Sequence, residues 1–100
     1  MFSNKENVNI LTALLVQHGI TQAVVCPGSR NSPLVHNLCE CKDIKCYPVT
    51  DERSAAFFAL GVAMSTHSPV VVCVTSGSAL LNVAPAVTEA YYQNLPLIVV

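Results

Sequence analysis

The sequence predicts an α/β fold in which a doubly wound parallel sheet is covered by helices on both faces. Short runs that are apolar on both faces alternate with segments of helical periodicity, in the order α-β-α-β-α-β-α-β. Hydrophobic residues make up 52% of the 100-residue chain and charged residues only 11%, less than half of the roughly 25% usual in soluble domains. This balance is typical of a domain that buries much of its outer surface.

The expected helices are marked by caps and prolines. Ser3–Glu6 has the S-x-x-E form of a capping box and should open a helix that ends near Gly19. Ser32 is expected to be the N-cap of a short helix, with a proline at its first position. A third helix is expected from 51 to about 64. Segment 76–92 indicates a turn and a long helix, which Pro85 either kinks or effectively starts.

Three apolar runs predict strands at 22–26, 69–75 and 95–100, and the run at 45–49 predicts a further, weaker strand. Pro48 lies in this weaker run and cannot donate a ladder hydrogen bond, so this strand is expected at an edge or an end of the sheet. The run at 95–100 closes the chain within a buried strand. We therefore expect residues 1–100 to be the N-terminal part of a domain of a longer polypeptide.

Composition excludes several classes of function. No apolar run approaches the ~20 residues of a membrane-spanning helix, and the N-terminus lacks the basic-then-apolar pattern of a secretory signal. We therefore expect a cytoplasmic domain. A net charge of −1 with five scattered cations argues against binding to nucleic acid or to an anionic membrane.

The cysteines and histidines offer weaker candidates. Cys39-x-Cys41 with Cys46 nearby could be taken for a metal cluster, but structural zinc sites need longer spacers and a full ligand set. We favour reduced thiols, with Cys26 and Cys73 as small core residues. The three histidines are expected to be surface or capping residues.

Polar segments follow three of the predicted strands, namely PGSR, TDER and TSGSA. Because ligands of doubly wound sheets bind beyond the carboxyl ends of the strands, these segments should converge on one site. The residues selected in this way are Ser29, Arg30, Asp51, Glu52, Arg53, Thr75, Ser76, Gly77 and Ser78.

Each segment also has a purely structural interpretation. TSGSA could present free backbone N–H groups to an anion or to polar ring atoms, or it could be a plain strand-to-helix turn. In TDER, Asp51 could be an N-cap with Glu52 near the positive end of the helix. One acid suffices for that purpose, and a buried Glu52 would suit proton transfer. Arg30 could be a surface residue, or its guanidinium could bind a carboxylate or phosphate.

Taken together and in this order, CPGSRNSPL, TDERSAAFFALGVA and VTSGSALLNVAPAVTEA closely resemble the N-terminal pyrimidine-binding domain of thiamine-diphosphate enzymes. Within that superfamily they are most similar to the synthases that join 2-oxoglutarate to isochorismate in menaquinone biosynthesis. The resemblance covers the chain from about Val8. The sequence departs from the family pattern at Asn31 and Ser78, where serine and threonine are expected, and at Ser54, where glycine is usual.

The resemblance implies a role for each segment. Glu52 matches the catalytic glutamate that hydrogen-bonds N1′ of the cofactor's aminopyrimidine and favours the tautomer that deprotonates thiazolium C2. Thr75, Ser76 and Gly77 would pass close to the pyrimidine ring. Ser29 and Arg30 fall on positions that meet the carboxylate-bearing substrates, 2-oxoglutarate and isochorismate.

The resemblance also implies partners. Mg²⁺ or Mn²⁺ and the diphosphate would be held by a diphosphate domain outside these 100 residues, contributed by another subunit of a homodimer or homotetramer. The chain alone would then be inactive. Two alternatives stay open, namely another thiamine-diphosphate lyase or decarboxylase (acetolactate-synthase-like or sulfopyruvate-decarboxylase-like), and a non-catalytic binding module of the same fold.

Overall fold

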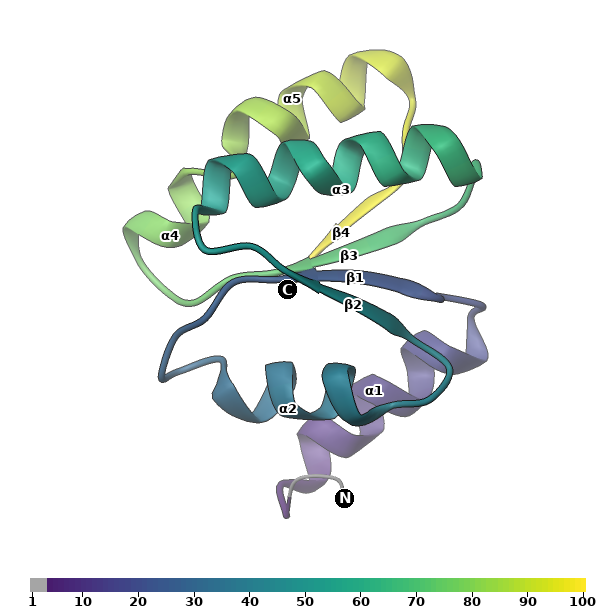
Figure 1. Ribbon diagram of the computed structural model, residues 1–100, viewed down its shortest axis with the longest axis vertical. Coiled ribbons are helices and arrows are strands. Elements are labelled where there is room, and N and C mark those ends of the chain that lie inside the picture. Colours follow the sequence, from purple (N-terminus) through teal and green to yellow (C-terminus); the bar gives the residue numbers. More distant parts are fainter. Residues whose placement is uncertain (1–3) are drawn as a thin grey trace.

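A computed structural model of the chain describes residues 4–100, and its elements follow the predicted order (Figure 1). The elements are α1 (Glu6–Gln17), β1 (Gln22–Val25), α2 (Ser32–Glu40), β2 (Lys45–Pro48), α3 (Glu52–Thr66), β3 (Val70–Cys73), α4 (Ser78–Leu81), α5 (Ala84–Gln93) and β4 (Leu97–Val99). No helix among the described residues is long and apolar enough to span a membrane.

All four strands run parallel, in the spatial order β2-β1-β3-β4. The predicted edge position of the strand with Pro48 is confirmed, since β2 pairs only with β1 among the described strands. α1 and α2 cover one face of the sheet, and α3, α4 and α5 lie on the other (Figure 1). The predicted fold class, a parallel sheet between two helical layers, is confirmed.

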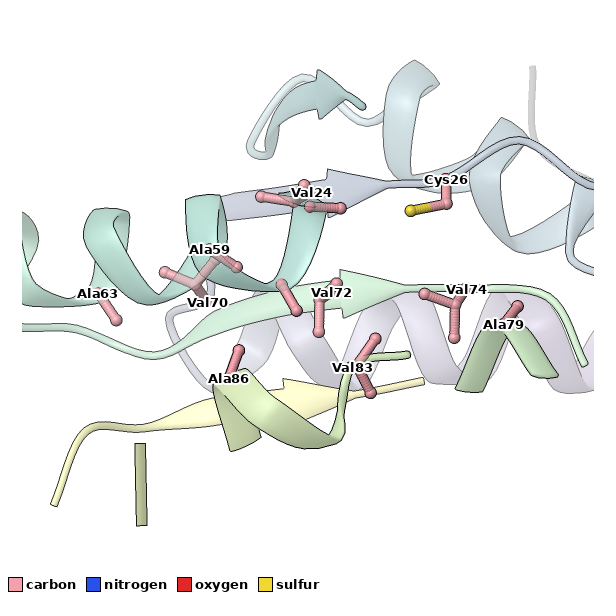
Figure 2. Close-up of a cluster of buried hydrophobic side chains, with 12 residues drawn as sticks. Val24, Cys26, Ala59, Ala63, Val70, Val72, Val74, Ala79, Val83 and Ala86 are labelled. Carbon is pink, nitrogen blue, oxygen red and sulfur yellow. The ribbon is translucent and has the colours of Figure 1, made fainter. Parts of the chain in front are cut away.

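Two apolar cores follow from the alternation of side chains along the central strands. Val24, Val70 and Val72 face α3 and α5, where small alanines such as Ala59 and Ala63 let the helix approach the sheet (Figure 2). The opposite core contains the alternate strand residues together with side chains from α1 and α2. Cys26 and Cys73 are fully buried, one in each core, as expected for small core residues.

Three helix boundaries refine or correct the sequence predictions. Ser3 lies outside the described residues, so the capping box is not described; α1 begins at Glu6 after Lys5. α1 ends as predicted, because Gly19 takes the left-handed conformation (φ 79°) and donates its N–H to the carbonyl of Val16. Of the two possibilities for the long helix expected over 76–92, the structure confirms that Pro85 effectively starts it. A four-residue α4 is separated from α5, and Pro85 lies in the first turn of α5.

The N-cap of α2 is Asn31 rather than Ser32. The carbonyl of Asn31 already accepts the first helical hydrogen bond, from the N–H of Val35 at 2.9 Å. Ser32 is therefore the first residue of the helix, and Pro33 follows within its first turn. The side chain of Asn31 does not cap the helix, because it is turned inward toward the sheet.

Candidate functional site at the carboxyl edge of the sheet

The carboxyl ends of β1, β2 and β3 lie side by side at one edge of the sheet. In the register of the ladder, Val25 of β1 is opposite Pro48 of β2 on one side and Cys73 of β3 on the other. The three connections that follow these strands, 26–31, 49–51 and 74–77, consequently emerge at the same edge, on the left of Figure 1. The sequence prediction that PGSR, TDER and TSGSA leave the sheet at one edge is confirmed.

Arg30 lies at the tip of a tight turn. The N–H of Ser32 donates to the carbonyl of Ser29 at 3.4 Å, which closes the four residues Ser29–Ser32. The dihedral angles of Asn31 (φ −95°, ψ 6°) are those of the third residue of a type I turn. Arg30 is therefore the second residue of the turn. It is exposed, and it forms no hydrogen bond or ion pair with another of the residues 4–100.

The turn is anchored by the amide of Asn31, which is only 3% exposed. Its Nδ2 donates to the carbonyl oxygen of Cys26 at 2.8 Å, and it lies 3.8 Å from Sγ of Cys73. The Cys26 N–H in turn donates to the Cys73 carbonyl at 2.9 Å. One side chain thus connects the Arg30 turn to the ends of both central strands.

Gly28 allows the first and third connections to touch. A Cβ built on Gly28 would lie 2.7 Å from Cβ of Thr75 and 3.0 Å from its Oγ1. These separations are well below the 3.5–4.0 Å of ordinary carbon contacts. A residue with any side chain would push the two connections apart, so the proximity of the PGSR and TSG segments depends on this glycine.

The two connections enclose a hollow of about 210 Å³. Its lining combines predicted site residues from both segments with apolar neighbours, namely Arg30, Asn31, Leu34, Val74, Thr75 and Ser76. Arginine is the group in this lining that would attract a carboxylate or phosphate, since its planar fork can donate two parallel hydrogen bonds. Arg30, Thr75 and Ser76 are therefore brought together as part of one surface.

Gly77 controls the exit from the third strand. Its backbone (φ 72°, ψ −131°) lies in a region that residues with a Cβ rarely adopt, and it precedes the single turn of α4. Because α4 is only four residues long, it adds little of the aligned dipole that a long helix would direct at an anion. The anion-binding interpretation of TSGSA thus loses its support from a long helix.

The two acids of TDER have different environments. Asp51 is exposed and is the N-cap of α3, because its carboxylate accepts a 2.9 Å hydrogen bond from the N–H of Ser54. That bond is the main cause that lowers the pKa of Asp51, with the Ser54 hydroxyl and Arg53 adding to it. Asp51 alone therefore satisfies the helix start, and the capping interpretation does not account for Glu52.

Glu52 is half-buried at the first position of α3. Its charge acts on the end of β1, where burial first, and the carboxylate of Glu52 next, raise the pKa of the Cys26 thiol to about 11. Glu52 is not among the described residues that line the 210 Å³ hollow. It lies at the same edge of the sheet, at the first residue of the helix that follows β2.

Two residues of the site were not selected from the sequence. Gly28 lies in the predicted PGSR segment but is not among the selected residues, and Asn31 enters the sequence analysis only as a departure from the family pattern. No local signal reveals their contacts, since Gly28 meets Thr75 and Asn31 meets Cys73 more than 40 positions along the chain. Of the selected residues, Ser29, Arg53 and Ser78 are exposed and do not line this hollow.

A second hollow, of about 460 Å³, lies away from this edge. It is lined mainly by aromatic and small residues of β2 and α3, including Tyr47, Phe57 and Phe58. It contains none of the residues selected from the sequence. Among the residues described, no group of three or more His, Cys, Asp or Glu side chains is arranged to hold a metal ion.

Comparisons with known proteins identify similar sequences and one similar solved structure. Residues 6–100 match the family described as the N-terminal TPP binding domain of thiamine pyrophosphate enzymes. Over its full length the chain is 57% identical to 2-succinyl-5-enolpyruvyl-6-hydroxy-3-cyclohexene-1-carboxylate synthase of Bacteroides thetaiotaomicron. It is 47% identical over 95% of its length to the enzyme of that name from Desulfotalea psychrophila.

The chain spans 18% of the length of each of these two relatives. Among solved structures, benzoylformate decarboxylase from Polynucleobacter necessarius superposes with a TM-score of 0.81 and 27% sequence identity. That superposition covers 92% of this chain and 17% of the decarboxylase.

Proposed function

The chain belongs to the family of the N-terminal TPP binding domain of thiamine pyrophosphate enzymes, and from this premise we propose that it supplies the pyrimidine-binding half of a thiamine-diphosphate site. The observation that carries the proposal is the convergence of three segments at one sheet edge. The hollow lined by Arg30, Thr75 and Ser76 lies at the edge where an open α/β sheet binds ligands. Glu52 begins the helix that follows β2 at the same edge.

We propose further that the whole protein is a synthase that decarboxylates 2-oxoglutarate and adds the resulting four-carbon unit to isochorismate. The support is the name shared by the relatives that are 47–57% identical to this chain, together with an arginine suited to carboxylate substrates. Residues 1–100 would then be the N-terminal part of the pyrimidine-binding domain.

The residues present fit the proposed cofactor. Gly28 lets the first and third connections touch and so closes this wall, and Gly77 has the positive φ that the path of the third connection requires. Thr75 and Ser76 add hydroxyl groups to the same wall. When bound, thiamine diphosphate supplies a nucleophilic carbon that adds to the carbonyl of a 2-oxo acid and accepts the electrons left when carbon dioxide departs.

Glu52 would hold a proton against N1′ of the aminopyrimidine. It is available for this because Asp51 already caps α3. Its place at the first residue of a helix, directly after an edge strand, fixes the carboxylate on a rigid element rather than on a loop. Its half-buried position restricts the access of water to the carboxylate without removing it from reach of a ligand.

Arg30, with Ser29 beside it, would bind a carboxylate of a substrate. The guanidinium is exposed on the tip of a turn and unpaired within residues 4–100, so its donors are available to an anion. The 210 Å³ hollow next to it is lined partly by apolar side chains, Leu34 and Val74. An anion bound there would be partly shielded from water, which strengthens the interaction.

The remaining components would come from outside this chain. We propose that the diphosphate and a divalent cation, Mg²⁺ or Mn²⁺, are held by a second domain, and that a homodimer or homotetramer completes the site between subunits. The five free cysteines are consistent with a reducing compartment such as the cytoplasm.

The test is an assay of the full-length protein with 2-oxoglutarate and isochorismate, with and without thiamine diphosphate and Mg²⁺. The proposal predicts product only when all four are present. Decarboxylation of 2-oxoglutarate without transfer would indicate another thiamine-diphosphate lyase. Failure of thiamine diphosphate to bind would leave a non-catalytic module of the same fold and overturn the proposal.

A further inference from the structure

We propose that Asn31 is a positioning residue for substrate binding, which holds the turn that presents Arg30 to the carboxylate of a substrate. This inference rests on the proposed role of Arg30. It concerns the conformation of residues 26–32, and it assigns to Asn31 no contact with the substrate or the cofactor.

The hydrogen bonds of Asn31 fix the turn from inside. Because the carbonyl of Cys26 can only accept, the group facing it at 2.8 Å must be the Nδ2 donor of the amide. The same Nδ2 lies 3.8 Å from Sγ of Cys73 on the neighbouring strand. The backbone carbonyl of Asn31 meanwhile begins helix α2 by accepting from Val35.

Arg30 depends on this anchor because little else holds its segment. The backbone bond that closes the turn, from the Ser32 N–H to the Ser29 carbonyl, is long at 3.4 Å. Neither Arg30 nor Ser29 is buried. The buried side chain of Asn31, at the third position of the turn, therefore determines where the exposed side chain of Arg30, at the second position, leaves the backbone.

The oxygen of the same amide is packed inside the loop that the amide holds. Oδ1 of Asn31 is buried and has no hydrogen-bond partner among the described residues, which carries a cost in free energy. It lies 3.0 Å from the position that a Cβ on Gly28 would occupy. The amide is thus packed against the backbone of the loop that it holds.

The chain contains a matched control in Asn37, a second buried asparagine. Asn37 is fully buried, and its Nδ2 donates to Oδ1 of Asn9 at 2.8 Å and to Oγ1 of Thr12 at 3.3 Å. These contacts join α2 to α1 and lie outside the strand-end connections. Removal of either amide should destabilise the fold, but only removal of the Asn31 amide should release Arg30.

The experiment is a double-mutant cycle in the full-length protein, with Arg30→Ala, Asn31→Ala, Asn37→Ala and the two combinations with Arg30→Ala. KM is measured for 2-oxoglutarate and for isochorismate at saturating thiamine diphosphate and Mg²⁺. Loss of a hydrogen bond to a charged group predicts a rise in KM of about 10- to 150-fold for Arg30→Ala with at least one substrate. Asn31→Ala should raise the same KM roughly 2- to 10-fold.

The decisive result is the KM of the double variant that combines Arg30→Ala with Asn31→Ala. In the Arg30→Ala background, Asn31→Ala should change that KM by less than about 2-fold, because a residue that acts through Arg30 has no effect without it. Asn37→Ala should leave KM unchanged in both backgrounds. Hydrogen exchange provides a readout without turnover, since Asn31→Ala should accelerate exchange in residues 28–32, at and before the start of α2, and Asn37→Ala should not.

The outcomes separate the two proposals. If Arg30→Ala leaves both KM values unchanged, the proposed substrate contact and this inference both fail. If Arg30→Ala raises KM and the Asn31→Ala effect is fully additive, or exchange is unchanged, only this inference is overturned. Should Asn31→Ala not fold, Asn31→Ser keeps one donor and is expected to raise the same KM by a smaller factor; an unchanged KM there also overturns it.

Discussion

Gly28→Ala tests whether the site depends on the close contact between the connections that follow β1 and β3. It adds one methyl group at the point where the PGSR and TSG connections touch. The backbone of Gly28 does not need the left-handed conformation, so the effect is steric rather than conformational. The new Cβ would lie 2.7 Å from Cβ of Thr75.

The magnitude follows from that distance. Carbon atoms in contact lie about 3.5–4.0 Å apart, so the two connections must separate by about 1 Å to admit the methyl group. Neither connection can rotate the clash away, because Cβ atoms move only with the backbone. Such overpacking costs about 1–3 kcal/mol in the free energy of unfolding. It should also widen the hollow between Arg30 and Thr75, and therefore raise KM for a carboxylate substrate.

The assay is denaturant unfolding of the full-length protein, together with the KM measurement. Gly61→Ala is the matched control, because it lies inside α3 and a Cβ there meets nothing within 4 Å. Alanine at that helical position should stabilise by about 0.5–1 kcal/mol. The reasoning is refuted if Gly28→Ala is as stable as Gly61→Ala and has the wild-type KM.

Two further predictions concern the connections that flank the site. Gly77→Ala should destabilise the fold by about 1–3 kcal/mol through backbone strain, because φ 72° with ψ −131° is a conformation that residues with a Cβ rarely adopt. Thermal unfolding measures this, and an unchanged melting temperature would contradict it. The hydrogen bond from the Ser54 N–H lowers the pKa of Asp51 in the folded protein. The contribution of this carboxylate to the stability of the fold is therefore complete above the pKa of Asp51 in the unfolded chain, and it is lost as the pH falls through the lower pKa of the folded protein. The stability difference between wild type and Asp51→Asn should therefore shrink from about pH 5 to about pH 2, and a constant difference would exclude the linkage.

The elements that the sequence predicted correctly are those determined by local chemistry. Continuous β-branched runs specified a fully parallel sheet, and Pro48 placed its strand at the edge because proline cannot donate to a neighbour on one side. The interpretation of Asp51 as an N-cap is confirmed, since an acidic side chain at that position needs only the N–H three residues on.

The errors come from residues whose partners are distant in sequence. Ser32-Pro33 is a good local N-cap signal, yet α2 begins one residue earlier because Asn31 is held by Cys26 and Cys73. The role of Gly28 depends on Thr75, 47 positions later, and a Pro-Gly pair indicates only a turn. The break between α4 and α5 agrees with Pro85, but the single-turn length of α4 had no clear signal in the sequence.

We propose that Glu52 is the acid–base residue of a thiamine-diphosphate site. The neighbouring carboxylate of Asp51 provides a matched control for a direct test. In the full-length protein, kcat is compared for Glu52→Gln and Asp51→Asn, with folding checked by thermal unfolding. Glu52→Gln should lower kcat by about 10²- to 10⁴-fold, the usual contribution of a positioned acid–base group, while Asp51→Asn, a change at a helix cap, stays close to wild type. Wild-type kcat in a folded Glu52→Gln protein would contradict the assignment.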